Sequence, residues 1–307
     1  MPHYEFYIVD VFADSSYAGN QLAVVTDSKN LSTSQMQKVA REFNFSESTF
    51  ISKRKQSYDV RIFTPRNELP FAGHPTLGTA WVIQQRMVKE KVSTIKLKLK
   101  IGEVPVTFQY NKNKPGLLWM KQKEPIFGDI FDPRDFSKIL GVRPEEIDRR
   151  FPVQIVSTGV PFFIVPLRSL KSLKSCKIAQ EPYYELVRDK EAKSILVFSP
   201  EAYNKDSNLA VRVFTEYYGI PEDPATGSGN GCLAAYLANQ EYFGKKEIDV
   251  AVDQGYEIDR PSKLFLKTEG SKKFGVKVGG RVFPAAAIDS FHSSLDHLHC
   301  LVSSQRA

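Results

Sequence analysis

Glu47 is the acidic residue whose sequence neighbours best suit proton transfer. It lies in the segment FNFSESTFI, flanked by Phe43, Phe45, Phe50 and Ile51. Apolar neighbours disfavour the charged form of a carboxyl group and raise its pKa toward neutrality, as a general acid or base needs. The plainer alternative is a solvated or capping glutamate, because the chain holds 35 acidic residues.

Two glycine-marked helix starts supply the other candidate residues. His74 follows Gly73 in AGHPTLGTA, and Asp223 opens DPATGSGNGCLAA. A helix N-terminus presents unpaired N–H groups and the positive end of the helix dipole, and glycines there let a ligand approach the backbone. These starts are therefore candidate sites for an anionic ligand. The residues expected at the second start are Gly227, Ser228 and Gly229.

Structural alternatives exist for the same residues. The glycines could serve only the close packing of a helix on a sheet, His74 could be a capping histidine, and Asp223 could be an N-cap aspartate. A nucleotide site is not indicated: the glycines at 227, 229 and 231 do not form GxGxxG, and the preceding strand ends well upstream.

An internal repeat gives the chain its organisation. At an offset of 151 residues, VRIFT at 60–64 falls on VRVFT at 211–215, Pro70 on Pro221 and Gly78 on Gly229. Six identities in nineteen positions exceed the roughly one that average composition predicts. The 307 residues therefore indicate two copies of one α+β unit, each with a helix packed in a curved sheet.

Hydrophobic periodicity places the elements of both copies. Helices are expected at 32–43, with a Ser N-cap and Asn44 just past the end, at 75–85 and at 227–239. Short connections favour antiparallel pairing. The expected strands are 4–12, 21–26, 48–53, 58–64, 94–100, 103–110, 152–157, 162–167, 194–199, 209–215, 247–253, 263–268, 273–278 and 281–288.

Composition excludes several classes of partner. The 42 Lys and Arg residues against 35 Asp and Glu give a net charge of +7, but a nucleic-acid site would need a clustered basic face with interleaved aromatic residues. The basic stretch 96–100 instead alternates lysine with leucine, as in a half-buried edge strand. No apolar run approaches the roughly 18 residues of a membrane span. We expect neither a nucleic-acid nor a membrane partner.

Cysteine and histidine usage argues against a metal site. Cys176, Cys232 and Cys300 are widely spaced with no CxxC, which predicts a reducing, cytoplasmic setting and no structural zinc. The last residues hold several histidines, but HxHC is not a standard zinc spacing. A polar C-terminal extension at 291–307 is expected instead.

These motifs together resemble the PhzF-like isomerase family of phenazine biosynthesis, built on the diaminopimelate epimerase fold. The resemblance spans residues about 9 to 288. It implies an α+β fold of two pseudo-symmetric domains, at 1–128 and 129–290, each a mostly antiparallel β-sheet wrapped around a central α-helix, with a last strand that can cross back. It also implies a substrate cleft between them, no cofactor and commonly a homodimer. The matching stretches are VDVFADSSYAGNQLAVV, FSESTF, VRIFTPRNELPFAGHPTLGTA, EDPATGSGNGCLA and QGYEIDRPS.

The resemblance assigns roles to particular residues. The catalytic residues of the family fall on Glu47, His74 and Asp223. The implied reaction is an isomerisation that moves a proton along the skeleton of a small carboxylate such as dihydro-3-hydroxyanthranilate. The alternative is a small-carboxylate-binding protein without a reaction of its own. The residues that match pocket positions are Asn20, Ser46, Gly73, Gly227, Ser228 and Gly229.

Cysteine placement separates two reaction types within this fold. Related epimerases and racemases use one cysteine at each helix start, whereas this chain has Ala72 and Thr226 there. Cys232 lies about six residues into the second helix. A two-cysteine racemase is therefore excluded, and Glu47 is the expected proton carrier.

Overall fold

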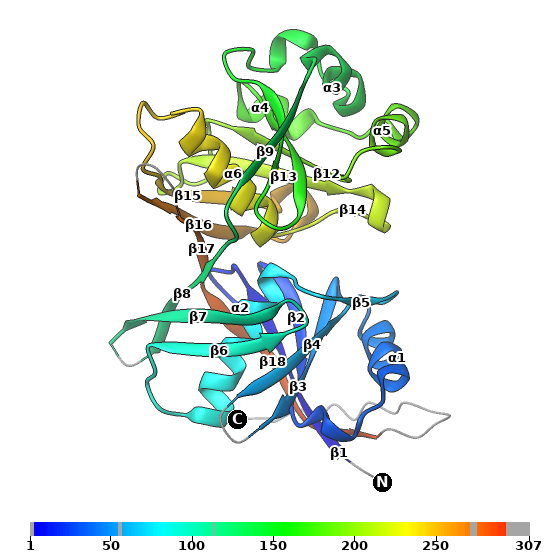
Figure 1. Ribbon diagram of the computed structural model, residues 1–307, viewed down its shortest axis with the longest axis vertical. Coiled ribbons are helices and arrows are strands. Elements are labelled where there is room, and N and C mark those ends of the chain that lie inside the picture. Colours follow the sequence, from blue (N-terminus) through cyan, green and yellow to red (C-terminus); the bar gives the residue numbers. More distant parts are fainter. Residues whose placement is uncertain (1–2, 55–56, 113, 271–274, 293–307) are drawn as a thin grey trace. The chain divides into compact units, whose positions relative to one another are not determined.

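The computed structural model describes residues 3–54, 57–112, 114–270 and 275–292. They divide into two compact units (Figure 1). Unit 1 contains the residues up to Met120 together with those from Arg281 onward, and unit 2 is Lys121–Gly280. The expected halves, residues 1–128 and 129–290, describe the two copies of the repeated unit, and these boundaries stay a prediction. Of the expected extension at 291–307, the part beyond His292 lies outside the described residues.

Unit 1 is built on a mostly antiparallel sheet in the order β18–β1–β2–β3–β4–β6–β7–β8, in which β2–β3 and β4–β6 are the parallel pairs. A two-residue strand, β5, pairs with β4. The strands are β1 (His3–Val11), β2 (Asn20–Val25), β3 (Glu47–Lys53), β4 (Tyr58–Phe63), β5 (Glu68–Leu69), β6 (Thr94–Leu99), β7 (Gly102–Asn111), β8 (Lys114–Lys121) and β18 (Val282–His292).

Unit 2 repeats this arrangement strand for strand. Its order is β9–β10–β11–β12–β13–β15–β16–β17, again with two parallel pairs, β11–β12 and β13–β15, and with the short β14 on β13. The repeated pairing pattern confirms the predicted fold class. The strands are β9 (Ile126–Phe131), β10 (Val153–Ser157), β11 (Pro161–Pro166), β12 (Ser194–Ser199), β13 (Leu209–Thr215), β14 (Ile220–Glu222), β15 (Asp249–Gln254), β16 (Ser262–Glu269) and β17 (Gly275–Gly280).

One buried helix lies within each unit. In unit 1, α2 (Gly73–Val82) is buried along its whole length and contacts β1, β2, β3, β6, β7 and β18 before continuing as a π-helical turn, Ile83–Val88. In unit 2, α6 (Gly227–Asn239) packs on β10, β11, β16 and β17. A helix that is apolar on all sides is stable only when it is enclosed. Both central helices were predicted, although α2 begins two residues earlier than expected.

Two glycines related by the 151-residue offset allow these helices to sit close to their sheets. A Cβ on Gly78 would lie 2.6 Å from Leu22 and 2.8 Å from Val11. A Cβ on Gly229 would lie 3.2 Å from Phe162 and 3.3 Å from Leu196. Helix–sheet packing is therefore a sufficient reason for glycine at 229.

The peripheral helices were predicted unevenly. Helix α1 (Thr33–Phe43) has the expected N-cap Ser32, which forms a reciprocal pair of hydrogen bonds with Gln35, and it ends at Asn44 in a left-handed conformation. Helix α3 (Pro133–Leu140), with Asp132 as the N-cap, was not among the expected helices. Two more helices in unit 2, α4 (Leu170–Ser175) and α5 (Gln180–Val187), were not predicted. Turns of 3₁₀ helix occupy Ser28–Asn30, Pro144–Glu146, Glu216–Tyr218 and Tyr256–Ile258.

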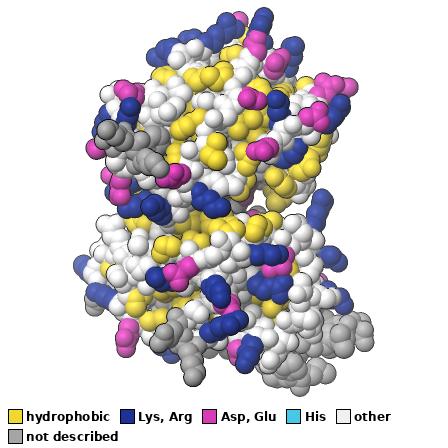
Figure 2. Space-filling model, viewed as in Figure 1, with side chains coloured by type: hydrophobic (Ala, Val, Ile, Leu, Met, Phe, Trp, Pro, Cys, Tyr) yellow, Lys and Arg dark blue, Asp and Glu magenta, His cyan; other side chains and the backbone are white. Residues whose placement is uncertain are grey.

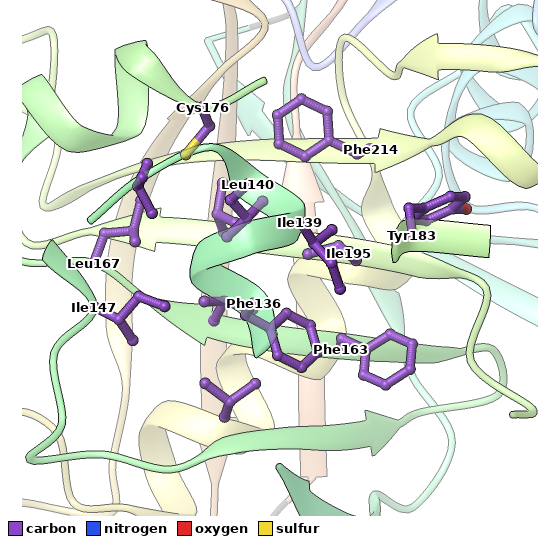
Figure 3. Packing of buried hydrophobic residues seen from close by; sticks show 14 of the residues in the cluster. Phe136, Ile139, Leu140, Ile147, Phe163, Leu167, Cys176, Tyr183, Ile195 and Phe214 are labelled. Atoms are coloured by element: carbon purple, nitrogen blue, oxygen red, sulfur yellow. The ribbon is translucent and has the colours of Figure 1, made fainter. Parts of the chain in front are cut away.

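Helices α3 and α5 cover the outer side of the unit 2 sheet and enclose an apolar cluster (Figure 3). The ring of Phe136 on α3 lies 5.4 Å from that of Phe163 on β11, and Tyr183 on α5 is fully buried in the same cluster. A smaller cluster between α1 and the unit 1 sheet contains Phe6 and Phe50. These outer clusters fix the sheets on which the central helices rest.

Surface charge is distributed over both units. Figure 2 shows Lys and Arg side chains spread over the visible face of each unit, with Asp and Glu side chains among them. The lysine–leucine alternation at 96–100 is confirmed up to Leu99, because Lys96 and Lys98 are exposed while Leu97 and Leu99 are buried. The expectation of an edge strand was wrong, since β6 lies between β4 and β7. No helix in the described part of the chain is long and apolar enough to span a membrane.

Candidate active site

Glu47 and His74 meet in unit 1. Glu47 is the first residue of β3 and His74 the second residue of α2. The Oε2 atom of Glu47 lies 3.4 Å from Nε2 of His74, and their side chains are 17% and 6% exposed. The expected pairing of a carboxyl group with an imidazole is thus present in an almost closed environment.

The imidazole of His74 is uncharged at neutral pH. Burial lowers the pKa of His74 to about 3, against a smaller raising effect of a hydrogen bond with the backbone of Gln21. A neutral imidazole carries a lone pair on one of its two ring nitrogens. Because the ring is neutral, its contact with Glu47 is not an ion pair.

The remaining unit 1 candidates lie at the same ends of the elements. Asn20 is the first residue of β2 and is buried, and Leu22 on that strand is the register partner of Glu47. Ser46 directly precedes β3, and Gly73 is the first residue of α2. The N-cap of α2 is Ala72, so the capping-histidine alternative for His74 was wrong.

Asp223 belongs to unit 2, directly after β14. Its backbone N–H donates to the carbonyl of Val213, and its Oδ2 accepts a 2.5 Å hydrogen bond from the hydroxyl of Thr226. Thr226, not Asp223, is the N-cap of α6, and its side chain does not cap the helix. The N-cap alternative for Asp223 was therefore wrong. Gly227, Ser228 and Gly229 form the first turn of α6, as expected.

Duplicated arginine–glutamate pairs precede both helix starts, and sequence reasoning missed them. Arg61 on β4 donates two 2.8 Å hydrogen bonds to Glu68 on β5. Arg212 on β13 donates bonds of 3.0 and 2.7 Å to Glu222 on β14. The repeat could have pointed to the arginines, because Arg61 and Arg212 occupy the same position of the repeated VR-x-FT segment. Each pair fixes the short strand that leads to His74 or to Asp223.

The two cysteines in the described residues are not placed for thiol chemistry. Cys232 lies in the second turn of α6, within 3.6 Å of the Thr158 hydroxyl, and Cys176 follows α4. Burial raises the pKa of each thiol to about 12. Both are therefore protonated, whereas thiol acid–base catalysis needs an accessible thiolate.

Comparison with known proteins identifies the family. The family model described as "Phenazine biosynthesis-like protein" matches residues 9–286. The chain belongs to this PhzC-PhzF family. As a PhzC-PhzF protein it is similar to the trans-2,3-dihydro-3-hydroxyanthranilate isomerase of Pseudomonas aeruginosa, with 33% identity over 87% of this chain and 91% of the relative. The enzyme of the same name from Pseudomonas fluorescens is 35% identical over the same shares.

The structural comparison agrees with the family assignment. The PhzF-family phenazine biosynthesis protein of Bacillus anthracis matches this PhzC-PhzF chain with a TM-score of 0.86 and 25% identity, covering 94% of this chain and 99% of that protein. The match extends over both units. The expected PhzF-like resemblance and the diaminopimelate epimerase-like fold are thereby confirmed.

Proposed function

We propose that this PhzC-PhzF protein is an isomerase that moves a proton along the carbon skeleton of a small cyclic carboxylate, with Glu47 as the general acid and base. The relatives named trans-2,3-dihydro-3-hydroxyanthranilate isomerase support the reaction class. The single observation that supports the role of Glu47 is its 3.4 Å contact with the neutral ring of His74.

The proton balance of the reaction closes without another reactant. The Glu47 carboxylate takes a proton from a carbon of the substrate, and the electron pair of that C–H bond enters the conjugated system. The resulting carboxylic acid returns the proton to a different carbon. Nothing is oxidised or reduced, so the proposed reaction uses no cofactor.

His74 supplies an acceptor for the transferred proton while Glu47 carries it. In the tautomer whose proton is on Nδ1, Nε2 presents a lone pair, and a proton on Oε2 of Glu47, 3.4 Å away, forms a hydrogen bond to it. The ring stays neutral throughout, because burial lowers its pKa to about 3. His74 thus stabilises the acid form of Glu47 without itself becoming charged.

The other site residues hold the substrate. The N–H groups at the starts of α2 and α6 suit a carboxylate, and Asn20 and Ser46 can hydrogen-bond polar substituents. The Asp223 carboxylate suits an N–H or O–H group of the substrate. This division leaves Glu47 as the residue that contacts the reacting carbons.

Product formation in deuterated water tests the proposal. The purified protein is incubated with trans-2,3-dihydro-3-hydroxyanthranilate, and product and deuterium content are followed by NMR and mass spectrometry. We expect product from the wild type and at least a 100-fold loss of rate in Glu47→Gln, in the range general acid–base catalysis contributes. Glu103→Gln is the control, since Glu103 lies on β7 in an exposed ion pair with Lys96.

Two results would contradict the proposal in different ways. A Glu47→Gln variant as fast as the wild type would remove the proton-transfer role of Glu47. Saturable binding of small carboxylates by the wild type, with no product from any of them, would instead establish a binding protein.

The family resemblance also supports a homodimer in the cytoplasm as a further part of the proposal. Analytical ultracentrifugation measures the assembly: a species of twice 34.7 kDa is expected, and a monomer at micromolar concentration would contradict it.

A further inference from the structure

Thr226 occupies an N-cap position but uses its hydroxyl for another purpose. The oxygen Oγ1 lies 2.5 Å from Oδ2 of Asp223 and 3.1 Å from Nε2 of Gln254. Gln254, the last residue of β15, is fully buried, and Thr226 is 8% exposed. The hydroxyl therefore joins the carboxyl group of Asp223 to a buried amide.

The orientation of the Gln254 amide is determined by its partners. Its Oε1 accepts from the backbone N–H of Thr226 at 3.2 Å and from Nδ2 of Asn230 at 2.8 Å. Its Nε2 donates to the backbone carbonyl of Asp223 at 2.8 Å. A reversed amide would place its NH₂ group against the backbone N–H, which is only a donor, and its oxygen against a carbonyl.

This orientation favours one direction for the next hydrogen bond. Nε2 of Gln254 donates to one lone pair of Oγ1, and the hydroxyl hydrogen of Thr226 points to Oδ2 of Asp223. While this hydrogen bond persists, Oδ2 is an acceptor, and a proton that Asp223 gains is on Oδ1.

We propose that Gln254 and Thr226 are positioning residues, which hold the Asp223 side chain in one rotamer with Oδ2 as a hydrogen-bond acceptor. The proposal rests on the proposed function, in which Asp223 contacts the substrate. It also accounts for the QG pair of the QGYEIDRPS segment, because Gln254 bonds the loop that carries Asp223.

The backbone conformation of Gly255 also helps to place Gln254 beside the loop that carries Asp223. It has φ = +79°, and a Cβ there would lie 2.6 Å from the carbonyl oxygen of Pro224. Only glycine allows β15 to turn this close to the residue that follows Asp223. In unit 1 the N-cap of the central helix α2 is Ala72, which has no hydroxyl, so this network is not duplicated with the fold.

Neutron diffraction of the deuterated wild-type protein tests the network directly. We expect the deuterium on Oγ1 of Thr226 to point at Oδ2 of Asp223, and both Nε2 deuterons of Gln254 to point at Thr226 Oγ1 and the Asp223 carbonyl. A deuterium on Oδ2, or a Thr226 hydroxyl that points elsewhere, would overturn the proposal. This measurement needs neither substrate nor variant.

Kinetics test the consequence for turnover. Thr226→Val keeps the shape of the side chain and removes the hydroxyl, and we expect kcat per folded molecule to fall about tenfold or more, as the loss of a hydrogen bond to a charged group predicts. Thr226→Ser should restore most of that rate. The matched control is Thr268→Val: Thr268 is a buried threonine of the same unit whose hydroxyl bonds the backbone of Ile248 and Lys246. Its substitution should lower stability and leave kcat unchanged.

A double-variant cycle separates positioning from simple stability. Gln254→Glu replaces the donating NH₂ by an acceptor, so the Thr226 hydroxyl no longer has to donate to Asp223. In that background the further change Thr226→Val should cost at most about twofold, since the interaction is already lost. Additive losses would contradict the proposal.

Asp223→Asn distinguishes this inference from the function on which it rests. If Asp223→Asn is inactive and Thr226→Val keeps the wild-type kcat, the positioning role fails alone. If Asp223→Asn turns over like the wild type, the proposed role of Asp223 fails, and the positioning role with it.

Discussion

The hydroxyl groups of Thr49 and Thr79 lie 2.8 Å apart and join β3 to α2, the two elements that carry Glu47 and His74. Both side chains are fully buried. Because alternate residues of a strand share a face, Thr49 and Glu47 both face the helix. This one hydrogen bond therefore connects the supports of the two residues proposed to handle the proton.

Thr79→Val should cost about 1–3 kcal/mol of unfolding free energy, because it leaves the Thr49 hydroxyl buried without its partner. The double variant Thr49→Val/Thr79→Val removes both polar groups at constant shape and should be close to the wild type. Urea unfolding followed by fluorescence measures both. A double variant that is less stable than either single one would contradict the assignment.

We expect His74 to affect how the unfolding free energy of the protein depends on pH in the acid range. Its pKa of about 3 in the folded protein lies below the ordinary 6.5, so the unfolded chain binds the extra proton between these values. His74 therefore does not lower the unfolding free energy above pH 6.5. Below pH 6.5 protonation of His74 in the unfolded chain lowers the unfolding free energy by up to about 1.4 kcal/mol per pH unit.

His74→Gln removes this contribution, so its unfolding free energy should depend less steeply on pH between about 4 and 6 than that of the wild type. The comparison requires urea titrations of both proteins at several pH values. In the wild type, the ring NMR signals of His74 should show no titration from pH 5 to 8. A ring that titrates near 6.5 would contradict a buried neutral imidazole.

Replacing the arginine of each arginine–glutamate pair should lower the unfolding free energy by different amounts, because the two pairs differ in burial. The side chains of Arg212 and Glu222 are 9% and 6% exposed, whereas those of Arg61 and Glu68 are 34% and 19% exposed. We expect Arg212→Met to destabilise by about 3 kcal/mol, since it leaves a buried carboxylate without its cation. Arg61→Met should cost about 1 kcal/mol, because water screens that pair.

The matched double variant Arg212→Met/Glu222→Leu should be more stable than Arg212→Met alone, because the Glu222 carboxylate, which lies nearest to the lost guanidinium, is also gone. Thermal and urea unfolding of the set give the comparison. Equal costs for Arg61→Met and Arg212→Met would show that burial does not govern these pairs.

Cysteine substitution should leave turnover intact. Cys176 and Cys232 are buried, and the pKa of each is about 12, so neither forms a thiolate near neutral pH. The double variant Cys176→Ala/Cys232→Ala should retain the wild-type rate per folded molecule. Iodoacetamide at pH 7.5 followed by peptide mass spectrometry should leave both unmodified in the native protein. Loss of product formation in the folded double variant would bring thiol chemistry back into the reaction.

The features of the fold that could be predicted from the sequence are those that depend on residues close together in the chain. Ser32 and Asn44 mark the ends of α1 through hydrogen bonds only a few residues long, and both were found as expected. The start of α3 was missed for a related reason: an aspartate followed by proline suits a turn as well as a helix start, and only the burial of Phe136 decides between them. Strand β8 was missed because Pro115 and Gly116 interrupt its pattern.

The candidate site shows the same limit. Apolar neighbours and helix starts made Glu47, His74 and Asp223 candidates, and the family resemblance assigned their roles, but the charge of His74 depends on burial that the sequence does not display. The partners of Gln254 lie 24 to 31 residues earlier in the chain, so its role emerges only once β15 is placed beside α6. Motifs mark where chemistry happens, whereas long-range contacts determine protonation and orientation.

Strand β18 has a consequence for the order of folding during synthesis. Its residues from Val282 pair with β1, Val282 lying opposite Val11, and α2 packs on it. Unit 2 is one continuous segment, so all of its strands are synthesised before β18. Unit 1, which holds Glu47 and His74, lacks one wall until the last strand arrives. The half of the protein that is translated first is therefore completed last.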